Sequence, residues 1–138
     1  MTAFLLDTDT ASRLLRADRV TVNAMRKSSA RDISVSVVTQ SELIFGARLR
    51  PESPALMSAV RAFLARVTVH AFDETAAEQH AAIRASVRRA GRSAGAFDLM
   101  IAAHARALGI TLATSDKAIA NLGIEGLRVV DWSARRRA

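Results

Sequence analysis

Short apolar runs alternate along this chain with longer segments in which apolar residues recur every three or four positions. The short runs are typical of β-strands, and the longer periodic segments are typical of helices. Strands are predicted over about 3–6, 33–37, 67–70, 110–113 and 127–130. Helices are predicted over about 9–16, 19–28, 40–49, 55–66, 74–90, 96–108 and 116–121. Such alternation predicts an α/β fold, with a mostly parallel sheet covered by helices on both faces.

Acidic residues stand where the predicted strands pass into helices. Asp7 follows the apolar run FLL, Glu42 comes shortly after ISVSVV, and Asp116 comes shortly after ITLA. A fourth acid, Asp98, opens a helix that is otherwise almost wholly apolar. Sites in parallel α/β sheets form beyond the carboxyl ends of the strands, and buried carboxylates are costly unless a cation meets them. In a chain with a formal net charge of +7, the four acids together predict a bound divalent metal.

Asp7 and Asp98 are the two acids that a structural role explains least well. Asp9, Thr10 and Ser12 can also cap the first helix, so capping does not require Asp7. Asp98 gains only about 0.3–1 kcal/mol from the dipole of its helix. A bare carboxylate buried in an apolar helix would lose several times that amount. Both acids are therefore assigned to the site as its principal metal ligands.

Glu42 and Asp116 each have a structural alternative. Thr39 and Glu42 match a capping box, in which Thr39 caps a helix and Glu42 reaches back to it. This role is compatible with metal binding, since a helix N-terminus also fixes the direction of a carboxylate. Asp116 closes the run Thr114-Ser115-Asp116, and any of the three can cap the following helix. The hydroxyl of Thr114 can also hydrogen-bond a ligand carboxylate or a metal-bound water.

The composition excludes several kinds of functional site. The chain contains no cysteine, which excludes disulfides, thiolate zinc sites and cysteine nucleophiles. No apolar stretch is long enough to span a bilayer, and no charged region precedes the short apolar run at the N-terminus, so a cytoplasmic protein is expected. The 138 residues fit one domain, predicted over 1–133, with a disordered basic tail over 134–138.

The basic excess is almost entirely arginine, with 18 arginines against two lysines. Arginine matches phosphate oxygens well, so a nucleic-acid partner is one explanation. A GC-rich genome also favours arginine over lysine, although it explains the excess over acids less well. His80, Arg84 and Arg88 recur at four-residue spacing, and such a stripe is either a solvated face or a ridge that contacts phosphates.

Four segments resemble the PIN-domain nucleases, and within them the VapC toxins of bacterial type II toxin–antitoxin pairs. The segments are LLDTD at 5–9, SVVTQSELIFG at 36–46, AFDLMIAAHA at 96–105 and LATSD at 112–116, and LRVVDW at 127–132 also fits. They occur in the order and spacing of that family and cover essentially the whole chain. LLDTD or LATSD alone would be a weak signal, but the four together are specific.

The resemblance implies a three-layer α/β/α sandwich on a five-stranded parallel sheet, normally assembled as a homodimer. It also implies an endoribonuclease that depends on Mg²⁺ or Mn²⁺ and hydrolyses RNA phosphodiester bonds. The acids of the family's metal site fall on Asp7, Glu42, Asp98 and Asp116, and its hydroxyl falls on Thr114. Glu42 and Asp116 would bind the metal directly or through water. The implied protein partner is a VapB-type antitoxin, bound in a hetero-oligomer, whose C-terminal segment blocks the site.

One residue departs from the family pattern, because Asp9 stands where asparagine is common. An extra carboxylate there would raise the pKa of one acid in the metal-free site through like-charge repulsion. It could also strengthen metal binding or shift the metal preference. Whether Asp9 caps the first helix or supports the site is left open by the sequence.

Two other functions remain open at this stage. Asp7-Thr8-Asp9-Thr10 matches the DxDxT motif of haloacid-dehalogenase-type phosphatases, with Asp7 as nucleophile and Asp9 as acid and base. No later acid pair or lysine motif of that family follows, and the chain is short for it. The other alternative is a non-catalytic module with the same fold that binds RNA or a protein. Such a module would not need four acids.

Overall fold

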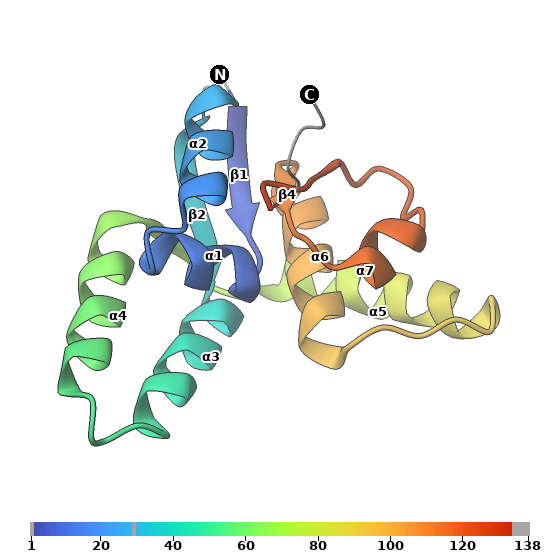
Figure 1. Cartoon of the computed structure of the whole chain (residues 1–138). Helices are drawn as coiled ribbons and strands as arrows, with labels where there is room; N and C mark the ends of the chain where they lie inside the picture. Colours follow the sequence, from blue (N-terminus) through green and yellow to red (C-terminus); the bar gives the residue numbers. More distant parts are fainter. Residues whose placement is uncertain (1, 29, 134–138) are drawn as a thin grey trace.

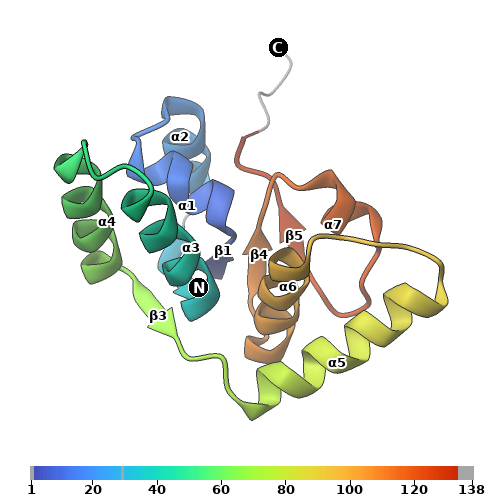
Figure 2. The same cartoon turned by 90° about the horizontal axis from the view of Figure 1, so that it is seen from below.

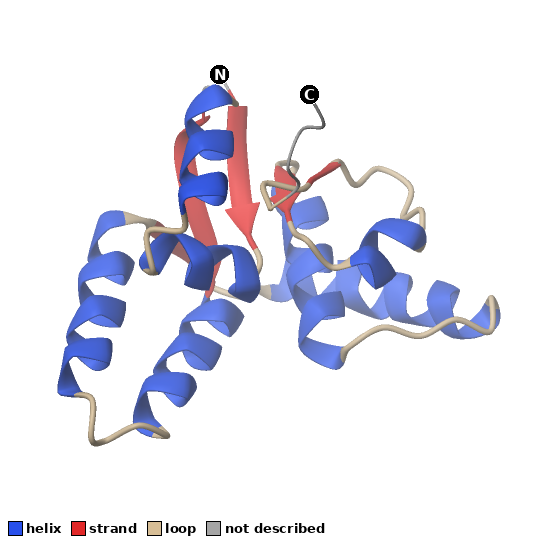
Figure 3. Ribbon diagram, in the orientation of Figure 1, coloured by secondary structure: helices blue, strands red, loops and turns tan. Residues whose placement is uncertain are grey.

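The strands form one five-stranded sheet in the computed structural model, which describes residues 2–28 and 30–133 (Figure 3). They are β1 (Thr2–Leu6), β2 (Ala30–Ser36), β3 (Thr68–His70), β4 (Thr111–Ala113) and β5 (Val129–Val130). Their order is β3-β2-β1-β4-β5, and every neighbouring pair is parallel. The predicted parallel sheet is therefore confirmed. The predicted basic tail, 134–138, lies outside the described residues.

Helices fill the connections between the described strands (Figure 1). They are α1 (Thr8–Leu15), α2 (Arg19–Lys27), α3 (Val37–Arg48), α4 (Pro54–Arg66), α5 (Glu74–Arg89), α6 (Ala96–Leu108) and α7 (Lys117–Asn121). The bounds of α6 are those predicted from its apolar pattern. None of the helices in the described part of the chain is long and apolar enough to cross a membrane.

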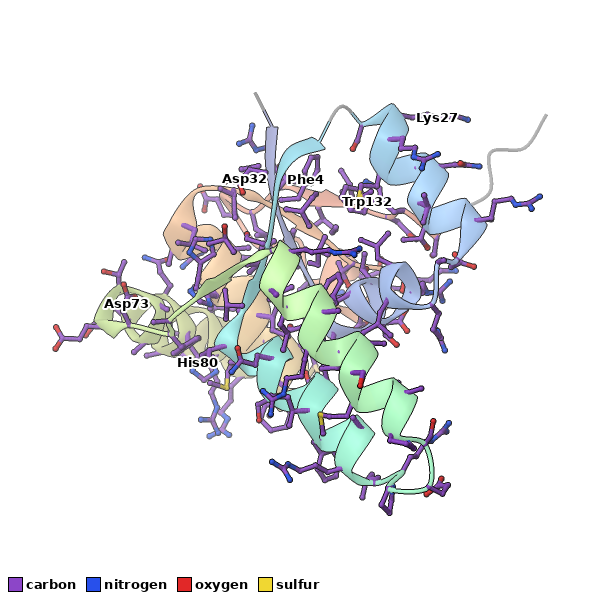
Figure 4. All side chains as sticks on the ribbon, turned by 90° about the vertical axis from the view of Figure 1, so that its left-hand side faces the viewer. Phe4, Lys27, Asp32, Asp73, His80 and Trp132 are labelled. Atoms are coloured by element: carbon purple, nitrogen blue, oxygen red, sulfur yellow. The ribbon has the colours of Figure 1, made fainter. Side chains whose placement is uncertain are left out.

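The side chains of β1 alternate between the two faces of the sheet and so divide the core in two. Leu5 packs with residues of α5, α6 and α7, whereas Phe4 and Leu6 pack with residues of α1, α3 and α4. Figure 2 shows the two groups of helices on opposite sides of the strands, as expected for an α/β/α sandwich. On the second side the rings of Phe4 and Trp132 lie with their centroids 4.9 Å apart (Figure 4).

β1 lies at the centre of the sheet, between β2 and β4, and the three strands end within one residue of one another. Leu6 of β1 stands opposite Val35 of β2 and Ala113 of β4. The chain passes from β1 to β2 and β3 on one side and then crosses to β4 on the other, which makes a topological switch point beside β1. Ligand sites in open α/β sheets form at the carboxyl ends of strands at such a point.

α3 begins earlier than predicted, at Val37 rather than near residue 40. Ser36, the last residue of β2, caps it by accepting a hydrogen bond from the backbone N–H of Val38 at 3.1 Å. Thr39 therefore lies inside the helix and is fully buried, so the predicted capping box of Thr39 and Glu42 is wrong. The β-branched pair Val37-Val38 favours a strand locally, which placed the predicted boundary too late.

Candidate active site

Asp7 directly follows β1 and is buried, with 6% of its surface exposed. Its Oδ1 accepts a hydrogen bond from the backbone N–H of Thr10 at 2.8 Å, so Asp7 caps α1. The argument that this helix does not need Asp7 as its cap is therefore wrong. Its Oδ2 accepts a hydrogen bond from the hydroxyl of Thr114. Burial raises the pKa of Asp7, and the hydrogen bonds from Thr114 and Thr10 oppose that rise.

Thr114 joins the carboxylate of Asp7 to the loop that carries Asp116. It follows β4 and is only 3% exposed. Its hydroxyl donates to Asp7 and accepts a hydrogen bond from the backbone N–H of Asp116 at 3.0 Å. Asp116 is the residue of its run that caps α7, since it accepts from the N–H of Ala118 at 2.8 Å. One buried hydroxyl thus fixes the relative positions of two predicted site acids.

Glu42 is held by α1 rather than by the start of its own helix. Its Oε1 accepts a hydrogen bond from the hydroxyl of Thr8 at 2.6 Å. Thr8 is the first residue of α1, directly after Asp7, and its hydroxyl lies 3.2 Å from that of Thr39. Sequence reasoning missed Thr8, although its place beside Asp7 was the available signal. With the capping box excluded, this contact leaves Glu42 beside the end of β1.

Asp98 lies in the first turn of α6 and is half-buried. Its pKa is raised to about 6, first by burial and then by the carboxylate of Asp116. The carboxylates of Asp7 and Glu42 raise it further. Salt screens exposed charges from one another beyond about 8 Å at physiological ionic strength, so the three acids that raise this pKa lie near Asp98. A Cβ atom at Gly95, the residue before α6, would lie 2.6 Å from Oδ2 of Asp98, so glycine leaves room for this carboxylate.

Asp9 is paired with residues outside this group of acids. Its Oδ2 forms an ion pair with Nε of Arg13 at 2.9 Å and accepts a hydrogen bond from the hydroxyl of Ser115 at 2.9 Å. Although burial opposes them, these contacts lower the pKa of Asp9. Repulsion from Asp9 still adds to the raised pKa of Asp7, after burial. Asp9 is therefore neither the cap of α1 nor isolated from the site.

The donor set suits a hard divalent cation. All the side chains that could coordinate are carboxylates and one hydroxyl, the oxygen ligands that Mg²⁺ and Mn²⁺ prefer. Across residues 2–28 and 30–133, no three Asp, Glu or His side chains stand close enough to hold an ion between them. Mg²⁺ commonly keeps several waters and takes only one or two protein carboxylates. The residues present therefore fit a partly hydrated ion better than a closed cage.

Comparisons with known proteins agree with this fold. A family model described as the PIN domain matches residues 4–125. The chain is 33% identical to the tRNA(fMet)-specific endonuclease VapC of Shigella flexneri, over 96% of this chain and 100% of that protein. It is 30% identical to the tRNA(fMet)-specific endonuclease VapC of Salmonella typhimurium, over 96% of this chain and 99% of that protein.

Solved structures give the same result at the level of the fold. The DNA-bound VapBC complex from Salmonella typhimurium has a TM-score of 0.85 to this chain at 29% identity, and covers 96% of this chain and 99% of its own. FitAcB from Neisseria gonorrhoeae has a TM-score of 0.73 at 27% identity, with 94% and 98% covered. The chain therefore belongs to the PIN-domain family, and within it to the VapC-type endoribonucleases of toxin–antitoxin systems.

Proposed function

We propose that this protein hydrolyses RNA phosphodiester bonds with a divalent cation, Mg²⁺ or Mn²⁺, held chiefly by Asp7 and Asp98. Glu42 and Asp116 would complete the site, directly or through water. The observation that carries this proposal is the hydrogen-bond network after β1, in which Thr114 joins Asp7 to Asp116 and Thr8, next to Asp7, holds Glu42. The raised pKa of Asp98, whose causes include burial and these three acids, agrees with it. Carboxylates gathered in this way repel one another, and a divalent cation relieves that repulsion.

Hydroxyl groups of the chain orient these acids. Thr114 and the backbone N–H of Thr10 hold the two oxygens of Asp7, and Thr8 holds one oxygen of Glu42. A bound divalent cation would supply a water of lowered pKa and stabilise the charge that develops on the scissile phosphate. A carboxylate that is not coordinated would accept the proton of the attacking water.

The proposal includes a protein partner. Solved relatives are VapBC complexes, among them VapBC-1 from nontypeable Haemophilus influenzae. By the same reasoning this chain pairs with a VapB-type antitoxin, as a homodimer within a hetero-oligomer, and the antitoxin blocks the four acids. We place this assembly in the cytoplasm, where RNA is available.

Asp98→Asn tests the site with a minimal change of shape. Cleavage of a labelled single-stranded RNA should require Mg²⁺ or Mn²⁺, stop in EDTA, and be lost in Asp98→Asn while the protein stays folded. Asp32→Asn is a suitable control, because Asp32 is an exposed acid near the amino end of β2, away from the carboxyl ends of the strands where the proposed site lies. Full activity of a clean Asp98→Asn preparation, or cleavage that persists in EDTA, would exclude this site.

The two alternative functions make different predictions. A phosphatase of the DxDxT type needs Asp9 as acid and base, yet Asp9 is held by Arg13 and its pKa is lowered, which suits a proton donor poorly. A covalent aspartyl-phosphate on Asp7 would revive that reading. A non-catalytic module would bind RNA without metal-dependent cleavage, so the same cleavage assay distinguishes it.

A further inference from the structure

A groove of about 430 Å³ runs between α5 and the start of α6. Its floor is apolar and includes Val87, Leu99 and Met100, of which the first two are buried. Its walls carry Arg84 and Arg88, together with three further polar residues, His80, Arg92 and Ser93. Figure 2 shows α5 alongside α6, with a loop that connects the end of α5 to the start of α6. We call this feature the α5–α6 groove.

The charge of the α5–α6 groove has one sign. Three arginines line it, and no aspartate or glutamate does. In the part of the chain that the structure describes, the one ion pair is that of Arg13 with Asp9, so Arg84 and Arg88 have no carboxylate partner there. Like charges four residues apart on a helix repel each other, so the bare stripe is unfavourable without an anion.

The third arginine has a structural contact as well. One nitrogen of Arg92 donates a hydrogen bond to the carbonyl of Asn121 at 2.8 Å, which ties the loop before α6 to α7. A guanidinium has five N–H donors, so this bond leaves others available to a ligand. Because Arg92 has this structural role, Arg84 and Arg88 are the cleaner residues to test.

The α5–α6 groove adjoins the proposed active site. Ala96, Leu99 and Met100 of the first turns of α6 line it, and Asp98 lies in the same turns. Successive residues of a helix are rotated by about 100°, so Asp98 projects from a different side of α6 than Leu99 and Met100. An RNA strand whose scissile phosphate lies at Asp98 would therefore reach the groove by passing around the N-terminal end of α6.

We propose that the α5–α6 groove binds the phosphate backbone of the RNA on one side of the scissile bond. This inference rests on the proposed function and identifies the surface that binds the RNA beyond the scissile bond. Arginine forks match phosphate oxygens, and the apolar floor provides a surface for a ribose or base that needs no specific sequence. A solvated helix face would have neither a hollow nor an apolar floor between its charges.

The test measures RNA affinity in the uncleaving Asp98→Asn protein with a short fluorescent single-stranded RNA at several salt concentrations. Arg84→Gln/Arg88→Gln should weaken binding and reduce the slope of log K against log salt by about 1.4, since each phosphate contact contributes roughly 0.7. Each single substitution should reduce it by about half as much. Arg61→Gln/Arg66→Gln on α4 is the matched control, because both arginines are exposed and α4 lies across the molecule from α5 (Figure 1).

Two results would overturn the inference. One is an RNA affinity and a salt slope that do not change in Arg84→Gln/Arg88→Gln, as expected if the groove binds a protein instead. The other is an equal reduction of affinity in this variant and in Arg61→Gln/Arg66→Gln, which would show only the effect of net charge. Circular dichroism verifies that each variant is folded, and the single variants decide the question if the double variant is not. Cleavage by the parent protein is scored separately, so its failure would exclude the proposed enzyme activity without changing the binding result.

Discussion

Replacing Thr114 with valine tests whether one hydroxyl organises the proposed active site. Valine keeps the branched shape of threonine but removes both hydrogen bonds of this hydroxyl. The buried Oδ2 of Asp7 then loses its donor, and the backbone N–H of Asp116 loses its acceptor. The change therefore acts on two acids without altering either of them.

The expected loss follows from the burial of the groups involved. Asp7 is 6% exposed and Thr114 is 3% exposed, so water cannot readily replace the lost donor. A buried group left without its partner costs about 1–3 kcal/mol, and somewhat more when it is charged. With a smaller contribution from Asp116, we expect a loss of about 2–4 kcal/mol in the free energy of unfolding. At roughly 4 °C per kcal/mol for a domain of this size, Tm falls by about 8–16 °C.

Thermal unfolding followed by circular dichroism in EDTA measures this loss without any contribution from metal binding. Thr111→Val is the matched control, because Thr111 is also buried in β4 and takes no part in the hydrogen bonds that join Thr114 to Asp7 and Asp116. Thr114→Ser, which keeps the hydroxyl, should recover most of the stability. If Thr114→Val unfolds at the same temperature as Thr111→Val, the hydroxyl does not organise the site and the reasoning fails.

Three further changes test other parts of the site. In EDTA the folded protein keeps the Asp98 proton up to a pKa of about 6, above the unfolded value of about 4, so stability should fall as pH rises between these values. Asp98→Asn should reduce that fall in urea titrations, leaving the part that the raised pKa of Asp7 contributes, and an unaltered pH profile would contradict it. Gly95→Ala should reduce RNA cleavage, because its Cβ would lie 2.6 Å from Oδ2 of Asp98, whereas Gly46→Ala meets nothing within 4 Å and should be active. Asp9→Asn should weaken Mg²⁺ binding about fivefold, the effect of one screened charge at roughly 1 kcal/mol, and equal affinities by calorimetry would remove Asp9 from the site.

The sequence predicts the elements of this fold better than it predicts their ends. α6 ends as expected because Gly109 follows it with φ of 68°, a conformation that glycine adopts easily and that commonly closes a helix. The start of α3 was predicted too late because the capping-box pattern at Thr39 depends only on neighbouring residues of the chain. The actual cap, Ser36, is set by the pairing of β2 with β3, in which Ser36 stands opposite His70.

The four acids could be named from the sequence, but the groups that hold them could not. The hydrogen bond of Thr8 with Glu42 joins residues 34 positions apart, and that of Thr114 with Asp7 joins residues 107 positions apart. No periodicity or motif links such distant positions, because they meet only when β1, β2 and β4 align in the sheet. The capping role of Asp7 was missed for a different reason, since several neighbouring residues were equally good candidates.

The choice of hydroxyls as partners for the acids is itself informative about the site. A hydroxyl orients a carboxylate without cancelling its charge, whereas an arginine would do both. The chain has a formal net charge of +7, yet within the described residues its one ion pair joins Arg13 to Asp9 and leaves Asp7 and Glu42 to threonines. If the site only needed rigid carboxylates, arginines could hold them, and the chain has many. A site that must remain negative until it binds a cation, either a metal ion or a side chain of the partner, requires neutral donors such as the threonine hydroxyls.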